Sequence, residues 1–339
     1  MLSVVLADLT YRHVELRFQH SRVFKMRAVR SYALGAGVTV LALDVSFSAT
    51  KLPDLDAGKT VAAPVDQQVL SAPTTSEFVP SNLTPALERA ADSTPKVYAD
   101  GCHGAYETTA SPDCTYGDRA GTESTVLFGD SHAAQWFTPL DEVAKEEGKK
   151  LISLTKSSCR SVDIPVRGKV SEAYPQCDEW RQDSLERIKT LAPDLVVVSN
   201  YGSVYRELGR DLGDFDQAWR EGLERTIKEL PEGTDVVVLG DTPGWEIAPS
   251  VCLSTNLQDV GECESPTEDV VDAEVASIEQ EAVQSAGGRY VSPIEWVCQE
   301  TCSPIAWNLL VYRDTHHLTN EMAGALSGRL QQALDVSAS

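Results

Sequence analysis

The string of residues with the clearest chemical potential is Gly129-Asp130-Ser131-His132, which follows the apolar run 125–128. A short β-branched run of this kind predicts a buried strand, and functional side chains gather where strands of an open α/β sheet end. A serine there, at the start of a helix, exposes its hydroxyl and places its backbone N–H where it can help to stabilise an oxyanion. By itself the string also fits a plain turn in which Ser131 is a helix N-cap.

A second string, Asp314-Thr315-His316-His317, lies close to the C-terminus. A nucleophilic serine needs a base to accept its proton, and that base needs an acid to hold its tautomer. Asp314 and His317 are three residues apart, so both side chains can reach one serine from a single turn. An isolated His-His pair is more often a solvated loop, but coupling to the Gly-Asp-Ser-His string favours the catalytic interpretation. We therefore predict a triad of Ser131, His317 and Asp314.

The two strings together resemble the first and last sequence blocks of the SGNH (GDSL-like) hydrolase superfamily. Three further features sharpen the resemblance: His132 after the serine, Cys159 after the second predicted strand, and the Asp-x-x-His-Leu-Thr ending that starts at Asp314. They are similar to the SGNH domain fused to the C-terminus of acyltransferase-3 membrane proteins, which O-acetylate cell-envelope glycans and lipids in bacteria. The resemblance covers residues 97–337 and implies that Asp314 orients the base His317.

The resemblance also implies oxyanion donors, namely a glycine after the second strand and an asparagine after the third. Asn200 stands in the second of these places, where it is either an oxyanion donor or a loop residue that caps its own turn. No glycine follows the second strand, so the backbone N–H of Ser157 or Ser158 is expected to serve instead. His132 is expected either to bind the acceptor or to pack against the helix start, and the Asp130 carboxylate to accept bonds from nearby backbone N–H groups.

These side chains need a sheet and helices to position them. Short β-branched runs alternate with longer amphipathic stretches from residue 120 onward, which is typical of parallel strands covered by helices on both faces. We therefore predict an α/β fold, a three-layer α/β/α sandwich with a parallel sheet, over residues 97–339. The expected strands are 125–128, 151–154, 195–199, 235–239 and 290–292, and the expected helices are 133–148, 178–191, 215–230, 267–286 and one after residue 319.

The N-terminal part predicts a membrane attachment. Residues 31–50 are mostly apolar and just long enough to cross a bilayer core of about 30 Å. Residues 1–30 carry a net charge of +4, which places that side in the cytoplasm by the positive-inside rule. We favour a retained transmembrane helix, with a cleaved signal peptide as the competing interpretation. Residues 9–17 resemble the end of an acyltransferase-3 membrane domain, and residues 51–96 are expected to be a flexible linker.

The cysteines indicate the cellular compartment, and the net charge restricts the class of partner. All eight cysteines lie beyond residue 100, which fits disulfides in an oxidising, extracytoplasmic compartment, most simply between sequential neighbours. A metal site built on Cys298 and Cys302 is the weaker alternative, because no second close pair completes four ligands. The net charge of -22 argues against nucleic acid as a partner. Six tryptophans are too scattered to predict a sugar-binding platform, and Trp136 is expected in the core.

The sequence thus predicts an O-acyltransferase, most simply an acetyltransferase, that acts through a Ser-His-Asp acyl-enzyme on a cell-envelope glycan or glycolipid. The expected acyl donor is an acyltransferase-3 membrane domain, and neither a cofactor nor a metal is expected. Two alternatives remain open. One is an esterase that uses water as the acceptor, and the other is a non-catalytic carbohydrate-binding domain on a degenerate esterase fold.

Overall fold

The computed structural model describes residues 59–65, 72–164, 174–203 and 215–335, all of which belong to one unit that spans Ala57–Ser339. The predicted cytoplasmic segment 1–30 and the predicted transmembrane helix 31–50 lie outside the described residues. Within the described ranges, no helix is both long enough and apolar enough to cross a membrane.

A seven-stranded sheet forms the centre of the domain, and its main strands run in the order β1-β4-β3-β5-β6-β8. All of these neighbours pair in parallel, whereas β2 pairs antiparallel with β4. The strands are β1 His103–Gly104, β2 Thr115–Gly117, β3 Ser124–Gly129, β4 Lys150–Lys156, β5 Leu195–Ser199, β6 Asp235–Leu239 and β8 Arg289–Val291. The predicted α/β class and its mostly parallel sheet are therefore confirmed.

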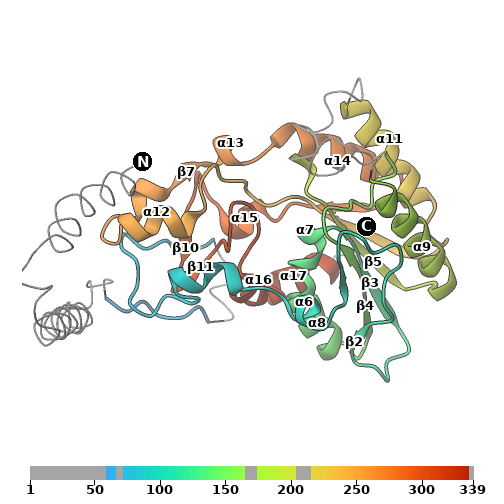
Figure 1. Ribbon diagram of the computed structural model, residues 1–339, viewed down its shortest axis with the longest axis horizontal. Helices are drawn as coiled ribbons and strands as arrows, with labels where there is room; N and C mark the ends of the chain where they lie inside the picture. Colours follow the sequence, from blue (N-terminus) through green and yellow to red (C-terminus); the bar gives the residue numbers. More distant parts are fainter. Residues whose placement is uncertain (1–58, 66–71, 165–173, 204–214, 336–339) are drawn as a thin grey trace, which may run out of the picture. The chain divides into compact units, whose positions relative to one another are not determined.

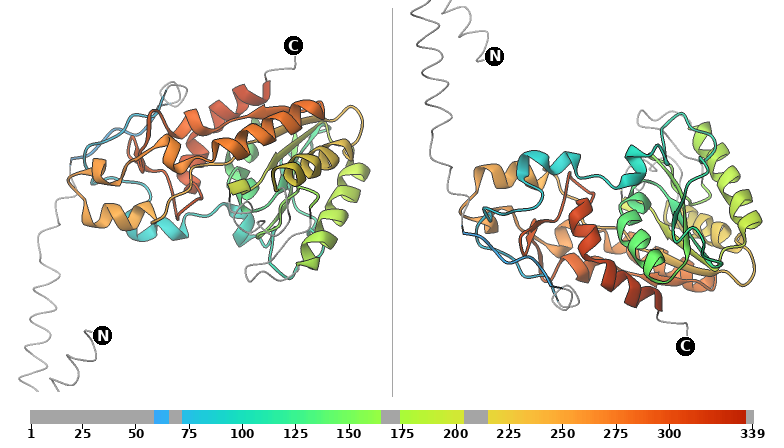
Figure 2. Two further views of the ribbon diagram at one scale, coloured as in Figure 1. Left: turned by 90° about the horizontal axis from the view of Figure 1, so that it is seen from above. Right: turned by 90° about the horizontal axis from the view of Figure 1, so that it is seen from below.

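Helices cover both faces of the sheet (Figure 1, Figure 2). Side chains alternate along each strand, so Val126 and Phe128 enter one apolar core while Leu127 enters the other. The first core contains α9 Pro175–Leu191, α11 Phe215–Lys228 and α14 Ala273–Ser285. The second contains α7 Ser131–Ala134, α8 Phe137–Glu146, α16 Asn320–Ala325 and α17 Ser327–Asp335, with Trp136 fully buried as expected.

Two of the predicted helices are broken in the structure. The stretch 133–148 divides into α7 and α8, because Pro139 has no N–H to donate to Gln135 four residues earlier and its ring crowds that carbonyl. The stretch 267–286 divides into α13 Thr267–Val270 and α14, since Asp272 caps α14 by accepting a 3.0 Å hydrogen bond from the N–H of Val275. Both breaks follow from local chemistry that the apolar periodicity alone does not register.

A satellite cluster forms beside the sheet from three segments that are distant in sequence. It buries Val79, Leu83 and Ala90 against apolar side chains of α12 Pro249–Thr255, η4 Val260–Cys263 and the hairpin of β10 Ile305–Ala306 and β11 Leu309–Leu310 (Figure 1). Residues 87–92 form the short helix η2. The expectation of a flexible linker over 51–96 is therefore corrected in its second part, since burial of these side chains holds residues 79–92 in the folded unit.

Four disulfides join sequential neighbours, as the simplest pairing predicts. They are Cys102–Cys114, Cys159–Cys177, Cys252–Cys263 and Cys298–Cys302. The last of these corrects the metal alternative at Cys298 and Cys302, because a sulfur in a disulfide cannot act as a thiolate ligand. The short strands β7 Ser265–Pro266 and β9 Thr301–Cys302 pair beside it, and the one-turn helix α15 Ile294–Val297 precedes it.

Candidate active site

The turn from β3 into α7 is built for close approach of backbones. Gly129 has a φ of 147°, and a Cβ there would lie 2.0 Å from the carbonyl oxygen of Ser199, so only glycine fits. Asp130 is fully buried, and its two carboxylate oxygens accept hydrogen bonds from the N–H groups of His132 (2.8 Å) and Tyr201 (3.0 Å). The carboxylate thus ties the ends of β3 and β5 together and leaves Ser131 half-buried at the start of α7.

His317 and Asp314 lie in the loop between β11 and α16. His317 Nδ1 is 2.8 Å from Asp314 Oδ2, while Asp314 Oδ1 accepts hydrogen bonds from the N–H groups of His316 (2.9 Å) and His317 (2.8 Å). With Nδ1 facing the carboxylate, Nδ1 carries the ring proton and Nε2 carries the lone pair. Nε2 is buried and has no hydrogen-bond partner among the described residues. The structure therefore brings the predicted pair of His317 and Asp314 into contact, and the basic Nε2 of His317 makes no hydrogen bond with the described residues.

Ser131 is the first residue of α7 and directly precedes His132. The ring of its neighbour His132 lies 4.8 Å from the ring of His317, between centroids, although no hydrogen bond joins Ser131 to His317 Nε2. Catalytic hydrogen bonds are often long before substrate binds and shorten in the reacting complex. The contact between His132 and His317 therefore brings the turn that carries Ser131 next to the loop that carries His317 and Asp314, and the completed triad stays a prediction.

The two predicted oxyanion donors differ in how far the structure supports them. Asn200 is 2% exposed, and its Oδ1 accepts bonds from the N–H and hydroxyl of Ser161 (2.8 and 3.1 Å), while its buried Nδ2 donor has no partner among the residues that the structure describes. Ser158 has a φ of 54°, the left-handed conformation for which glycine is the usual residue. Ser157 is excluded because its N–H donates to the carbonyl of Gly104. Asn200 Nδ2 and the Ser158 N–H remain as candidates.

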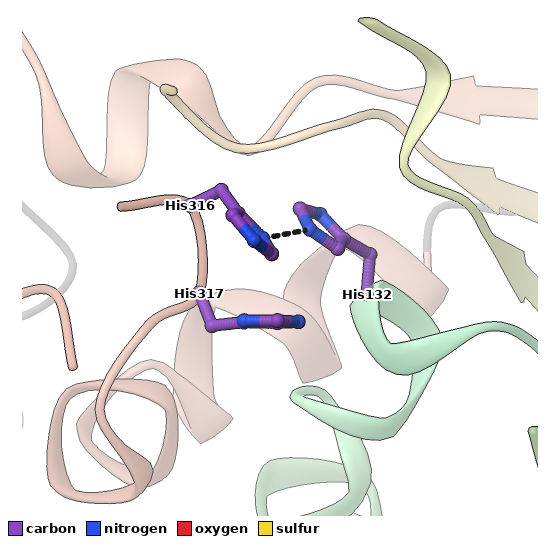
Figure 3. Close-up of side chains that lie close together, drawn as sticks. All are labelled: His132, His316 and His317. Carbon is purple, nitrogen blue, oxygen red and sulfur yellow. Dashed lines mark hydrogen bonds between the residues drawn. The ribbon is translucent and has the colours of Figure 1, made fainter. Parts of the chain in front are cut away.

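His132 does not simply pack against the helix start. Its Nδ1 lies 2.6 Å from Asp241, which follows β6, and its Nε2 lies 2.9 Å from His316 Nδ1 (Figure 3). The ring of Tyr201 stacks on both histidines, with centroid distances of 4.2 Å to His132 and 4.3 Å to His316. A second histidine–carboxylate pair, His132 with Asp241, therefore lies beside the first and reaches His316.

The electrostatic environment shifts the pKa of the histidine in opposite directions in the His317–Asp314 and His132–Asp241 pairs. Burial lowers the pKa of His317 well below its usual value, and the neighbouring His132 and His316 lower it further against the opposing bond to Asp314. Burial also disfavours the charged form of His132, but the carboxylates of Asp241, Asp130 and Asp314 together outweigh burial and raise the pKa. The pKa of His316 falls to about 4 through burial and the charge of His132. The lowered pKa favours the neutral form of His317, which a general base needs, while the raised pKa favours the charged form of His132.

Sequence reasoning missed three residues that hold the site together. Gln135 Oε1 accepts a 2.9 Å bond from the N–H of Leu318, and the Thr242 hydroxyl donates to the carbonyl of His316 at 3.0 Å. Asp241, already described, is the third. Asp241 and Thr242 come directly after a strand, so the rule that functional groups follow strand ends could have found them. Gln135 has no comparable signal, because its partner is far away in the sequence.

Three histidines are the described residues that could hold a metal ion, since one ring nitrogen from each of His132, His316 and His317 lies within 4.8 Å of the others. The geometry argues against it. Tetrahedral zinc with Zn–N bonds of about 2.0–2.1 Å separates its nitrogen ligands by roughly 3.3 Å, whereas His132 Nε2 and His316 Nδ1 are 2.9 Å apart. That distance is a hydrogen bond, which accounts for the pair without an ion.

Two grooves of the described surface differ in their relation to these residues. The larger, about 880 Å³, contacts Ser124 and Lys150 at the beginnings of β3 and β4, away from the strand ends that carry the triad. The smaller, about 680 Å³, is lined by Tyr201, Ser203 and Trp245. Size therefore does not locate the site. The smaller groove shares Tyr201 with the histidine stack, so it is the groove that adjoins the candidate active site.

A family model for the SGNH domain fused to AT3 domains matches residues 101–332, which covers every site residue discussed above. The chain belongs to this SGNH domain family. The family described from the sequence motifs is thereby confirmed, and the match begins just before β1 and ends within α17. No curated protein matches the chain.

Two solved structures align with the chain. The periplasmic domain of a Salmonella ser. Paratyphi A lipopolysaccharide acetyltransferase aligns with a TM-score of 0.52 at 18% identity, over 64% of this chain and 85% of that one. A carbohydrate acetylesterase family member from Sinorhizobium meliloti aligns with a TM-score of 0.39 at 15% identity, over 63% and 97%. At such identities the first likeness shows the SGNH fold alone, and the second is too weak to carry an argument.

Proposed function

We propose that this SGNH domain is an O-acyltransferase that moves an acyl group, most simply acetyl, to a hydroxyl of a cell-envelope glycan or glycolipid. The observation that carries the proposal is Nε2 of His317, which is buried and has no hydrogen-bond partner in the described part of the chain, while the other ring nitrogen lies 2.8 Å from Asp314. Such a nitrogen is poised to accept a proton from a serine at the same sheet edge. The family match and the likeness to an acetyltransferase domain are consistent with this reaction.

The chemistry divides into two steps. In the first, His317 Nε2 takes the proton of Ser131 while Oγ attacks the acyl carbonyl, and the donor's leaving group departs with that proton. In the second, the acceptor hydroxyl gives its proton to His317 and attacks the acyl-serine ester; the bond from the acyl carbon to Ser131 Oγ breaks, and Oγ recovers the proton. Asn200 Nδ2 and the Ser158 N–H are the proposed donors to the oxyanion in both steps.

The donor and the location form part of the same proposal. The family takes its name from fusion to AT3 domains, and the aligned Salmonella domain is periplasmic. Four disulfides fit an oxidising compartment. We place the domain on the extracytoplasmic side, anchored by residues 31–50, with an acyltransferase-3 membrane domain as its acyl donor.

Hydrolysis is the competing function, because water can replace the acceptor in the second step without any change in the first. Labelling of the full chain with a fluorophosphonate tests the step that both share. We expect labelling of the unmodified chain and none of Ser131→Ala or His317→Ala. Envelope O-acetylation in cells that carry Ser131→Ala then separates the two functions, since unchanged acetylation would rule out the transferase. Absence of labelling in the folded, oxidised chain would instead favour a binding domain.

A further inference from the structure

The groove of about 680 Å³ beside the histidines has walls of a distinct chemical kind. Two aromatic side chains, Tyr201 and Trp245, contribute to its lining, together with the hydroxyl-bearing Ser203. Four of its carboxylate residues are exposed, and they are Glu246, Glu268, Asp269 and Glu274. Aromatic faces that pack on the C–H faces of a sugar, combined with acceptors for hydroxyl protons, suit a polyhydroxylated ligand.

This groove is bonded directly to the loop that carries the proposed base. The backbone N–H of Trp245 donates to the carbonyl of Thr315 at 2.7 Å, and that of Gly244 donates to Val270 at 2.8 Å on the other wall. Tyr201 stacks on His316 with centroids 4.3 Å apart. A ligand held against Tyr201 and Trp245 would therefore lie next to the catalytic turn rather than at a remote surface.

His316 is the side chain through which the groove meets the site. Its Nδ1 is occupied by His132 Nε2 at 2.9 Å (Figure 3), and His132 Nδ1 in turn faces Asp241 at 2.6 Å. Asp241 also accepts a 3.1 Å bond from the Ser203 hydroxyl, so the chain of contacts begins in the groove wall itself. The His316 ring is half-buried and fixed from one side. Its second nitrogen, Nε2, is left as the polar group that can meet a ligand.

Charge decides which polyhydroxylated ligand fits. None of the described residues that line this groove is lysine or arginine, whereas five of them are acidic. The larger groove, by contrast, contains Lys96, Arg119 and Lys150. A phosphate or carboxylate on the ligand would be repelled by the exposed carboxylates of the smaller groove, and an ammonium group would be attracted. An uncharged or amino-bearing sugar is therefore favoured over an anionic one.

We propose that this groove is the acceptor subsite, that His316 Nε2 hydrogen-bonds the bound sugar, and that the acceptor is an uncharged or amino-bearing glycan. The inference rests on the proposed acyl transfer and adds the place and charge class of its acceptor. His316 acts here as a binding residue, positioned by Asp241 through His132. The reacting proton still passes from the acceptor hydroxyl to His317 Nε2 and on to Ser131 Oγ, so no further base is required.

The test uses the full chain, p-nitrophenyl acetate as the donor, and glucosamine, glucose or glucose 6-phosphate as the acceptor at one concentration. Mass spectrometry gives the ratio of acetylated sugar to free acetate, with fluorophosphonate labelling used to count folded sites. We expect transfer to glucosamine and glucose to exceed transfer to glucose 6-phosphate by about tenfold, which corresponds to about 1.4 kcal/mol.

Variants of the groove residues and of His316 test which residues form the acceptor subsite. We expect Trp245→Ala and His316→Gln each to lower the transfer ratio about tenfold, and the double variant Glu268→Gln/Asp269→Asn to reduce the discrimination against the phosphate. Asp235→Asn, at the beginning of the strand β6 that Asp241 follows, is the matched control and is expected to change nothing. An exposed carboxylate occupies that position.

The outcomes separate this inference from the proposed function. An unchanged transfer ratio in both Trp245→Ala and His316→Gln, or a preference for glucose 6-phosphate, overturns the acceptor subsite while leaving the acyl-enzyme intact. Transfer to none of the three sugars by a chain that labels at Ser131 also overturns it. Absence of both labelling and acetate release in the unmodified chain means that the proposed function itself fails.

Discussion

Two histidine–carboxylate pairs lie side by side in the candidate active site, and the pKa of the histidine is shifted in opposite directions in the two pairs. His317 lies 2.8 Å from Asp314, and His132 lies 2.6 Å from Asp241. The contacts are nearly alike in length, and both rings are buried. Nevertheless, the pKa of His317 is lowered well below its usual value, whereas that of His132 is raised.

The difference lies in what surrounds each pair. His132 has three carboxylates acting on it, those of Asp241, Asp130 and Asp314, and they overcome the penalty of burial. For His317, burial is the largest cause of the lowered pKa; its one carboxylate partner, Asp314, opposes that shift, and the neighbouring His132, His316 and Arg313 add to it. A carboxylate contact therefore does not by itself raise the pKa of a histidine. The balance between burial and the surrounding charges decides the direction of the shift.

The largest effect is expected at the proposed reacting atoms. Ser131→Ala and His317→Ala should each lower the rate of acetyl release from p-nitrophenyl acetate by about 10⁴-fold or more, because a triad without its nucleophile or base keeps only binding and oxyanion stabilisation. The measurement is steady-state release of p-nitrophenol, with circular dichroism to show that the variants fold. Loss below tenfold in either variant would contradict the assigned triad.

The next effect compares the two carboxylates directly. Asp314→Asn should cost about 10³–10⁴-fold in the same rate, since the wrong tautomer of His317 would be stabilised. Asp241→Asn removes the partner of a histidine that takes no proton from the substrate, and about tenfold is expected. Stopped-flow traces of acylation report both values. Equal losses in the two variants would mean that His132, rather than His317, shares the role of base.

The pH dependence should separate the pairs further. The reactive form of His317 is the neutral one, and its lowered pKa keeps it neutral, so the fluorophosphonate labelling rate should stay level from pH 8 to about 6.5 and fall only in more acidic solution. Asp241→Asn removes the carboxylate that raises the pKa of His132. With less charge on His132, the pKa of His317 should rise and the acidic limb should move to higher pH. A limb that does not move would contradict the proposed coupling.

The smallest effect is expected from metal removal. Because the His132–His316 contact of 2.9 Å is a hydrogen bond, no ion is needed to hold the three histidines together. Dialysis of the full chain against a chelator should leave its labelling rate and its melting temperature unchanged. Loss of either, with recovery on addition of zinc, would show that the cluster is a metal site and that the two pairs are ligands.

Local sequence patterns were sufficient for much of the sheet and for the contact between His317 and Asp314. The strands 195–199 and 235–239 coincide with β5 and β6, and the remaining predicted strands overlap β3, β4 and β8. Asp314 and His317 lie three residues apart, so a single turn brings them into contact whatever the rest of the chain does. Information of this kind lies within a few neighbouring residues, where periodicity and turn chemistry act.

The satellite cluster was not predictable in the same way. Residues 79–92 are rich in small and polar side chains, so the stretch reads as a linker. They are ordered by contacts with Leu253, Val260 and Leu310, which come from distant segments. The neighbouring Cys252–Cys263 bridge closes one of those segments on itself. A few apolar side chains are enough to hold such a stretch in place when other segments supply an apolar surface for them. That surface is formed by residues distant in the sequence, so local patterns do not reveal it.

The sequence by itself determined the parallel α/β architecture and the closeness of Asp314 and His317; for the cysteines it favoured pairing of sequential neighbours and left the other pairings open. Only the tertiary structure decided that His132 meets Asp241 and His316, that Gln135 anchors the loop of His317, and that Tyr201 and Trp245 line one groove. The physical reason is that parallel strands end at one edge of a sheet. Their loops become neighbours there through strand order, which is set by packing of the whole domain rather than by distance along the chain.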